Sequence, residues 1–277
     1  MLSVSELYIY PVKSLGGVAV KSAKITSRGF KYDRRLMLVD ANNKCLTQRD
    51  LPEMAMLQPA IEDKGFAIVH KKDPSRSLFI PHQPDGNLLA DVTIWDDICS
   101  GKVYQQSINN WFTEVLNTQC RLIYMPDSSQ REIDKRYAHN GEVTSFADEY
   151  PLLIIGQASL DDLNNRLEIP VPINRFRPNI VFTGGTAFQE DEMDEFLIGD
   201  ITFNAVKPCK RCVIITINQH TKEKSKEPSK TLATYRFHDK GICFGQNLLH
   251  KGDGVIHTGD AIEIKSRKTA ITFNNKL

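Results

Sequence analysis

Short runs in which apolar and polar residues alternate dominate the chain up to about residue 125. Alternation with a period of two is typical of strands that bury one face. Turn residues, such as the Asn42-Asn43 pair, separate the runs roughly every 8 to 12 positions, a spacing that favours an antiparallel barrel or a strongly bent sheet. The expected strands span residues 4–10, 18–26, 35–40, 44–47, 66–70, 77–80, 91–95 and 101–105.

One helical segment interrupts this pattern between Ser107 and Leu116. Apolar residues recur there three or four positions apart, which places them on one face of a helix. They are Ile108, Trp111, Phe112 and Val115.

The chain after about residue 120 again favours strands. Residues 151–155 form a continuous apolar run, which is typical of a strand buried on both faces. Ser159 is the expected N-cap of a helix with leucines at 160, 163 and 167 on one face. The polar segments 126–140 and 221–230 are expected to be exposed, and no regular β-α-β alternation is visible. The other expected strands span 120–125, 177–183, 194–198, 201–206, 213–217 and 254–264.

Composition limits the classes of function. The chain has 277 residues, 41% of them hydrophobic, and a formal net charge of +1, so it offers no global attraction to nucleic acid or to an anionic membrane surface. It has neither a signal-peptide layout at its start nor a run of about 18 apolar residues. We therefore expect a cytoplasmic protein with no nucleic-acid or membrane partner. Its length suits two domains, predicted at residues 1–120 and 121–277, with the chain termini packed across the boundary.

Two of the six cysteines form a close pair in the string Lys207-Pro208-Cys209-Lys210-Arg211-Cys212. Cations beside a thiol favour the thiolate, the form that binds metals and attacks electrophiles. A structural zinc site needs four ligands, and no second pair exists. A thioredoxin-like pair would open a helix, whereas β-branched residues follow here. One reactive thiolate or one soft ligand to the metal of a bound cofactor remains, beside the alternative of two ordinary buried thiols.

Five further groups of polar residues could recognise a ligand, although each alone also fits an ordinary turn or strand end. The arginines of 174–179 suit a phosphate or carboxylate, and Lys13-Ser14 before two glycines could cradle a phosphate. The amides of Gln246 and Asn247, in an expected glycine turn, suit the edge of a heterocycle. The groups are Lys13-Ser14, Asp33-Arg34-Arg35, Asp148-Glu149-Tyr150, Asn174 to Asn179, and Phe244-Gly245-Gln246-Asn247.

Taken together and in this order, these strings resemble the MOSC-domain proteins (molybdenum cofactor sulfurase C-terminal domain family) with their N-terminal β-barrel domain. The strings Leu197 to Asp200 and Tyr10 to Ser14 also fit. The likeness is closest to the amidoxime-reducing branch. It implies a mostly β (α+β) fold, in which a MOSC-type β-barrel domain with a few helices follows an N-terminal MOSC β-barrel domain. It also implies a molybdenum–molybdopterin cofactor held between the two domains.

The resemblance further implies roles for individual residues. Cys212 matches the cysteine that ligates molybdenum and is expected to be catalytic, and Asp148 is the first candidate for supplying protons. The residues expected to contact the cofactor are Lys13, Ser14, Arg34, Glu149, Tyr150, Arg177, Lys210, Arg211, Cys212, Gln246 and Asn247.

The activity that the resemblance implies is reduction of N-hydroxylated compounds such as amidoximes, hydroxylamines and N-hydroxylated bases. No cysteine cluster for an iron–sulfur centre follows Ile264. We therefore expect electrons to come from a separate ferredoxin, flavodoxin or cytochrome-type protein. Two alternatives stay open: a sulfur carrier in cofactor sulfuration, and a non-catalytic carrier of the molybdenum cofactor.

Overall fold

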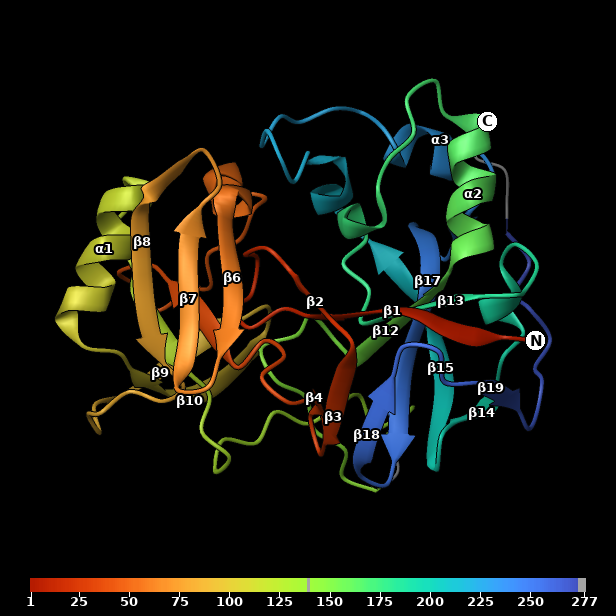
Figure 1. Cartoon of the computed structure of the whole chain (residues 1–277), viewed down its shortest axis with the longest axis horizontal. Helices are drawn as coiled ribbons and strands as arrows, with labels where there is room; N and C mark the ends of the chain where they lie inside the picture. The colour runs from red at the N-terminus through yellow and green to blue at the C-terminus, as the bar shows by residue number, and fades with distance from the viewer. Residues whose placement is uncertain (139, 274–277) are drawn as a thin grey trace.

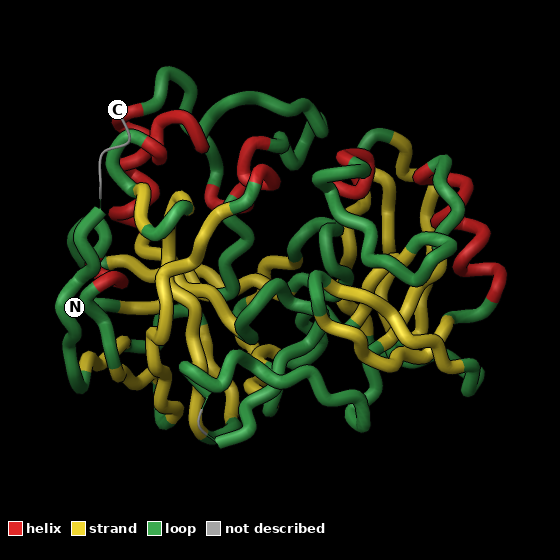
Figure 2. The backbone as a smooth tube through the Cα atoms, turned by 180° about the vertical axis from the view of Figure 1, so that it is seen from behind, coloured by secondary structure: helices red, strands yellow, loops and turns green. Residues whose placement is uncertain are grey.

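The computed structural model describes residues 1–138 and 140–273. Two groups of strands form two lobes, with helices at their outer edges (Figure 1). Seen from behind, loops fill most of the region between the two groups of strands (Figure 2). The expected strand-dominated fold with a few helices is confirmed. None of the helices in the described ranges has the length and apolar character needed to cross a bilayer.

The first lobe contains two sheets and one helix. One sheet has three strands and the other has the order β5-β11-β10-β9. Helix α1 buries Ile108 and Phe112 against them, as its periodicity predicted. The elements are β5 (Leu36–Val39), η1 (Pro52–Met56), β6 (Leu57–Glu62), β7 (Gly65–His70), β8 (Asp73–Pro81), β9 (Leu89–Ile94), β10 (Asp97–Val103), α1 (Gln106–Leu116) and β11 (Arg121–Tyr124).

The second lobe is built on a nine-stranded sheet with the path β19-β14-β15-β17-β12-β13-β1-β2 and β16 beside β17. A small sheet, β18-β3-β4, adjoins it. The elements are β1 (Ser3–Ile9), β2 (Val18–Val20), β3 (Ser22–Thr26), β4 (Gly29–Phe30), β12 (Leu152–Gly156), α2 (Gln157–Arg166), η2 (Ile173–Arg175), β13 (Ile180–Thr183), η3 (Gln189–Asp191), β14 (Glu195–Ile198), β15 (Ile201–Arg211), η4 (Val213–Thr216), α3 (Ser229–Ala233), β16 (Phe237–His238), β17 (Gly241–Lys251), β18 (Gly254–His257) and β19 (Ile262–Ile264).

Strand β12 lies inside this sheet and is buried on both faces. Leu152 and Ile154 belong to the apolar core on one face, whereas Leu153 and Ile155 belong to the core on the other. This explains the uninterrupted apolar run from which the strand was predicted. β12 runs parallel to β13, and α2 connects them. The chain therefore contains one β-α-β unit, although the sequence shows no regular β-α-β alternation.

The two lobes exchange strands. β1 pairs with β13, at Ser3 opposite Thr183, and so joins the sheet of the second lobe. β11 follows residue 120 but pairs with β5 in the first lobe. The division at residue 120 stays a prediction, and the N-terminal strand does cross into the second lobe.

The β-branched residues of 213–217 predicted a strand. The structure instead has the 3₁₀ helix η4 at Val213–Thr216. The Thr216 hydroxyl donates to the carbonyl of Val213 at 2.7 Å. The carbonyl of Ile215 accepts from Arg175 Nη1 at 3.2 Å, and the Ile215 side chain is buried. Tertiary packing and a side-chain hydrogen bond therefore override the local strand preference.

The 244–247 string is also not a turn, because it lies inside β17. The register with β15 shifts there: Pro208 pairs with Gln246 and Lys210 pairs with Cys243. Two residues of β17 thus face one residue of β15, which is a β-bulge. Gly245 has φ +81°, and a Cβ at this position would lie 2.9 Å from the carbonyl oxygen of Ile154. Glycine is needed for the bulge, not for a chain reversal.

Ser159 is not the N-cap of α2, which is Gly156. Its hydroxyl instead donates to Glu190 Oε2 at 2.8 Å, inside the protein. Glu190 is fully buried, and its Oε1 accepts from the amide of Gly156 at 3.2 Å. Burial and the neighbouring Asp191 raise the pKa of Glu190 to about 7.

This buried carboxyl predicts how the stability changes with pH. Because the folded-state pKa exceeds the ordinary 4.5, the folded protein holds an extra proton between these values. Protonated Glu190 contributes about 3 kcal/mol to the free energy of unfolding. This contribution is complete below pH 4.5 and is lost as the pH rises through 7. We expect Glu190→Gln to flatten the fall of melting temperature between pH 5 and pH 8. The exposed control Glu168→Gln should keep the wild-type profile, and an unchanged profile in Glu190→Gln would refute the assignment.

Candidate functional site

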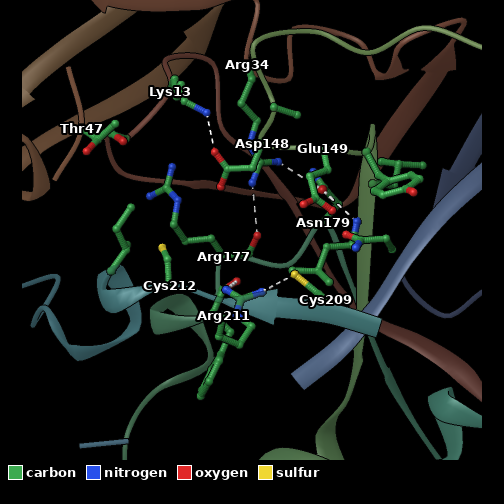
Figure 3. A pocket seen from close by; sticks show the side chains of 18 of the residues that line it. Lys13, Arg34, Thr47, Asp148, Glu149, Arg177, Asn179, Cys209, Arg211 and Cys212 are labelled. Atoms are coloured by element: carbon green, nitrogen blue, oxygen red, sulfur yellow. Dashed lines mark hydrogen bonds and ion pairs between the residues drawn. The ribbon is translucent and has the colours of Figure 1, made fainter. Parts of the chain in front are cut away.

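A polar pocket collects residues from both lobes and from the connection between them (Figure 3). Five cations and two carboxylates line it, although the whole chain is nearly neutral. The pocket therefore favours an anionic ligand. Its lining residues are Lys13, Ser14, Arg34, Thr47, Arg49, Ala147, Asp148, Glu149, Tyr150, Leu152, Leu153, Phe176, Arg177, Asn179, Cys209, Arg211, Cys212, Ile214 and Asn247.

An ion pair between a buried lysine and a largely exposed carboxylate forms one wall. Lys13 Nζ lies 2.6 Å from Asp148 Oδ1 and also donates to the carbonyl of Phe146 at 2.9 Å (Figure 3). Burial lowers the pKa of Lys13, and Asp148 offsets only part of this effect. Burial would raise the pKa of Asp148, but the charge of Lys13, helped by Arg34, outweighs it and holds that pKa below its ordinary value. Asp148 is thus a carboxylate at neutral pH, and the proton of this pair resides on Lys13 Nζ.

Two arginines flank the ring of Tyr10. The guanidinium carbons of Arg34 and Arg177 lie 4.2 and 4.3 Å from the ring centroid. Arg177 Nη1 donates to the carbonyl of Leu15 at 2.6 Å, and its other N–H groups have no acceptor within the described residues. Burial lowers the pKa of Arg177 to about 10, which leaves it charged at neutral pH. Arg177 can therefore present a fork of free donors to an oxyanion.

The buried carboxylate of Asp33 holds Arg34 in place. Its Nη1 lies 2.6 Å from Asp33 Oδ2 and 3.1 Å from Asn179 Oδ1. Asn179 in turn donates to Asp33 Oδ1 at 3.1 Å. This network orients Arg34 at the pocket wall.

Three of the pocket residues predicted from the sequence have left-handed backbone conformations. The φ angles are +65° at Ser14, +48° at Arg34 and +53° at Arg177. Such conformations cost a non-glycine residue about 1–3 kcal/mol and concentrate at functional sites. Their coincidence in one pocket supports a functional role.

The two cysteines of the motif have different environments. Arg211 Nη1 donates to Cys209 Sγ at 2.9 Å (Figure 3), and burial raises the pKa of the Cys209 thiol. Cys212 follows the last residue of β15, and its sulfur points toward the pocket. Its thiol has no hydrogen-bond partner among residues 1–138 and 140–273. Cys212 is thus the thiol that is free to bind a ligand.

The other predicted residues divide into two groups. Glu149, paired with Lys207 at 2.9 Å, lines the pocket, as do Tyr150, Arg211 and Asn247. Lys210 and Gln246 do not line it.

Lys210 and Gln246 point elsewhere for simple geometric reasons. Lys210 Nζ pairs with Asp239 at the surface and contributes instead to an adjoining groove. Gln246 is fully buried and donates to Asp191 Oδ1 at 2.7 Å. Successive side chains of a strand alternate between faces, so Asn247 faces the pocket and Gln246 the interior.

Thr47, Arg49 and Asn179 also line the pocket but were not predicted as site residues. Asn179 belongs to the same string as Arg177, so its polar character beside two arginines was a usable signal. Thr47 ends an expected strand and Arg49 follows it in an ordinary polar stretch, which carried no such signal.

The adjoining groove has a volume of about 810 Å³ and shares Asp148, Glu149, Cys209 and Cys212 with the pocket. It is also lined by residues 95–97 and 131–136. The groove therefore offers a second molecule access to Cys212 beside a ligand in the pocket.

The described residues contain no group of three or more His, Cys, Asp or Glu side chains that could hold a metal ion. A metal at Cys212 would therefore have to arrive with most of its own ligands. A single soft thiolate among cations suits an anionic cofactor that carries such a metal.

Comparison with known proteins identifies both halves of the chain. A model of the MOSC N-terminal beta barrel domain matches residues 1–119, and a model of the MOSC domain matches residues 141–263. The chain is similar to "Mitochondrial amidoxime-reducing component 1" of Mus musculus, with 31% identity over 94% of this chain and 81% of the relative. "Mitochondrial amidoxime reducing component 2" of Bos taurus is 34% identical over 86% and 73%, respectively. "Molybdenum cofactor sulfurase" of Oryza sativa subsp. japonica is 30% identical over 88% of this chain but only 32% of its own length.

The difference between the two thiols can be measured directly. In protein free of cofactor, we expect iodoacetamide at pH 7.5 to modify Cys212 faster than Cys209, because burial raises the Cys209 pKa and Arg211 occupies its sulfur. Peptide mass spectrometry over a time course gives both rates. Buried Cys120 serves as a slow internal reference. Faster modification of Cys209 would contradict the assignment of Cys212 as the free thiol.

Proposed function

The chain belongs to the MOSC-domain family, and from that premise we propose that it is a molybdenum-dependent oxidoreductase that reduces N-hydroxylated compounds. The observation that carries this proposal is the thiol of Cys212, which has no hydrogen-bond partner in the described part of the chain and lies in a pocket lined by five cations. The two domain models and the relatives named for the molybdenum cofactor or for amidoxime reduction support it. The cofactor predicted from the sequence, molybdenum–molybdopterin, agrees with these relatives.

The residues present fit such a cofactor. Cys212 supplies a soft ligand for molybdenum, and Lys13, Arg34 and Arg177 supply positive charge for a pterin phosphate. Two buried polar atoms on pocket residues lack a partner within the described part of the chain, Arg211 Nε and the Tyr150 hydroxyl. A polar ligand would satisfy these groups, which are costly to leave unpaired.

When bound, the cofactor would supply two-electron redox chemistry at its metal. The protein's own residues bind the anionic group and hold a proton. Reduction of an N–O bond to N–H and water consumes two electrons and two protons. The Lys13–Asp148 pair holds one proton at Lys13 Nζ, and the sequence-based role of Asp148 is thereby refined to that of the carboxylate that keeps this proton in place.

The groove beside the pocket is the proposed path of the substrate. Trp95, at the turn between β9 and β10, lines the groove with its side chain 44% exposed. The guanidinium of Arg49, a pocket residue, lies 4.1 Å from the Trp95 ring centroid. A planar substrate would find in Trp95 a rigid aromatic surface to stack on.

The electrons are proposed to come from a separate electron-transfer protein of the ferredoxin, flavodoxin or cytochrome type. The cytoplasmic location expected from the sequence stays a prediction, and the amidoxime-reducing relatives are named as mitochondrial proteins. Cofactor sulfuration is the less favoured function, since the sulfurase likeness covers only 32% of that relative.

Metal analysis and turnover test the proposal. Protein made in a host that synthesises molybdopterin should carry roughly stoichiometric molybdenum, which Cys212→Ala should lose and Cys209→Ala should retain. With a reduced flavodoxin or a chemical reductant, the loaded protein should convert benzamidoxime to benzamidine, as followed by chromatography. Equal molybdenum in both variants would refute the ligand assignment. Loaded protein without turnover would favour a carrier, and sulfur transfer to apo-enzyme would favour sulfuration.

The role of Trp95 gives a second test. We expect Trp95→Ala to raise the KM for benzamidoxime about two- to tenfold, which corresponds to an aromatic stacking contribution of ~0.5–1.5 kcal/mol. Trp95→Phe keeps a ring and should stay near the wild-type KM. Hydroxylamine has no ring to stack, so its KM should not change in either variant. A similar rise for both substrates would show that Trp95 acts through the fold and not through stacking.

A further inference from the structure

Five consecutive backbone carbonyls, those of residues 144–148, each accept a hydrogen bond from a buried cation. This 144–148 segment ends the connection from the first lobe and leads directly into the pocket residues. The pairs are Arg28 Nη1 to Thr144 O (3.0 Å), Arg131 Nη1 to Ser145 O (3.1 Å), Lys13 Nζ to Phe146 O (2.9 Å), Arg131 Nη1 to Ala147 O, and Arg131 Nη2 to Asp148 O (2.9 Å).

Arg131 makes three of these five contacts. Its side chain is only 6% exposed, and its Nε lies 2.7 Å from Asp97 Oδ2. Asp97 is the first residue of β10 in the first lobe. Arg131 thus fixes the 144–148 segment to a strand end of the first lobe, through a guanidinium whose donors point in set directions.

The position of this segment decides where the pocket's ion pair lies. Asp148 Oδ1 is 2.6 Å from Lys13 Nζ, and Ala147, Asp148, Glu149 and Tyr150 all line the pocket. A displacement of the segment by 1 Å or so would separate the pair and move its charges relative to Cys212. Displacements of that size cost enzymes up to about a hundredfold in rate.

Arg28 provides a comparison within the same molecule. It is also buried, and it donates to the carbonyls of Asp127, Ser129 and Thr144. None of these three residues lines the pocket or the groove. Arg28 and Arg131 are therefore both buried arginines that donate to backbone carbonyls. The carbonyls that Arg28 binds lie away from the pocket, whereas Arg131 binds those of the pocket residues Ala147 and Asp148.

We propose that Arg131, anchored by Asp97, is a positioning residue of the pocket, which acts by holding the carbonyls of residues 145, 147 and 148 so that Asp148 meets Lys13. Arg131 lines the adjoining groove but not the pocket itself, and within the described residues its hydrogen bonds go to Asp97 and to backbone carbonyls, not to the pocket's anion-binding groups or the free thiol. Its effect passes through the backbone of the segment. The inference concerns the pocket of the proposed function, but its main test does not depend on any reaction.

The main test measures the reactivity of Lys13 in protein without cofactor. A lysine that is buried and paired reacts slowly with an acylating reagent. We expect Arg131→Gln to raise the labelling rate of Lys13 several-fold, because the segment and Asp148 move away. Arg28→Gln should leave that rate near wild type, although both variants lose a buried arginine. Mass spectrometry of the Lys13 peptide gives the rate, and melting temperatures show how far each variant is destabilised.

Asp97→Asn is the milder variant, since Asp97 is half exposed and its loss removes one anchor only. It should raise the labelling rate in the same direction by a smaller factor. If Arg131→Gln does not fold, this variant alone decides the matter. Two outcomes would overturn the positioning role. In the first, Arg28→Gln raises the Lys13 labelling rate as much as Arg131→Gln or Asp97→Asn does. In the second, none of these variants changes that rate.

Kinetics of loaded protein give an independent readout. Arg131→Lys should lower kcat about tenfold or more while the molybdenum content stays near wild type. In an Asp148→Asn background the same change should have little further effect, because the group being positioned is already absent. Additive effects would show that Arg131 acts elsewhere. If the protein proves not to reduce N-hydroxylated compounds at all, the labelling result still stands or falls by itself.

Discussion

The structure depends on burying positive charge beside backbone carbonyls. An isolated charge is costly to remove from water, so a buried cation must find hydrogen-bond acceptors. Here Arg28, Arg131 and Lys13 find most of them on backbone carbonyls, including all five carbonyls of residues 144–148. A carbonyl satisfies an N–H group without cancelling its charge, whereas a carboxylate would do both. The protein can therefore keep a positive potential in its pocket at a formal net charge of only +1.

The same constraint explains why the pocket cations differ in their hydrogen-bond partners. Lys13 and Arg34 each have a carboxylate partner, Asp148 and Asp33. Within the described residues, Arg177 has only a carbonyl and an aromatic ring as partners. Lys13 and Arg34 are therefore held in place by their carboxylates, whereas Arg177 keeps N–H groups available for a ligand. Ser14, Arg34 and Arg177 also hold strained backbone angles, which the hydrogen bonds around them maintain.

Much of the site was predictable because its residues stand in short strings with a recognisable chemistry. The strings around Cys212, Lys13 and Arg177 suggested metal or anion binding, but the role of each residue came from the resemblance to the MOSC-domain family. The strand β12 and the helix α1 were predicted from their hydrophobic patterns. The bulge at Gly245 was not, because a glycine beside two amides predicts a turn equally well. Which of Gln246 and Asn247 faces the pocket follows only from the strand register. Arg131 lies in a polar segment that reads as exposed, and its burial depends on carbonyls that no side-chain pattern encodes.

The pairing of β1 with β13 has a consequence for how the chain folds during synthesis. β1 is made first, but its partner residues, up to Thr183, emerge only after the whole first lobe. Until then β1 has unpaired amide and carbonyl groups along the edge that later contacts β13, and such edges invite wrong pairing. Closing a loop of this length is also slow. Folding of the second lobe is therefore coupled to completion of the first, and the interval between them is when the nascent chain is most exposed to aggregation.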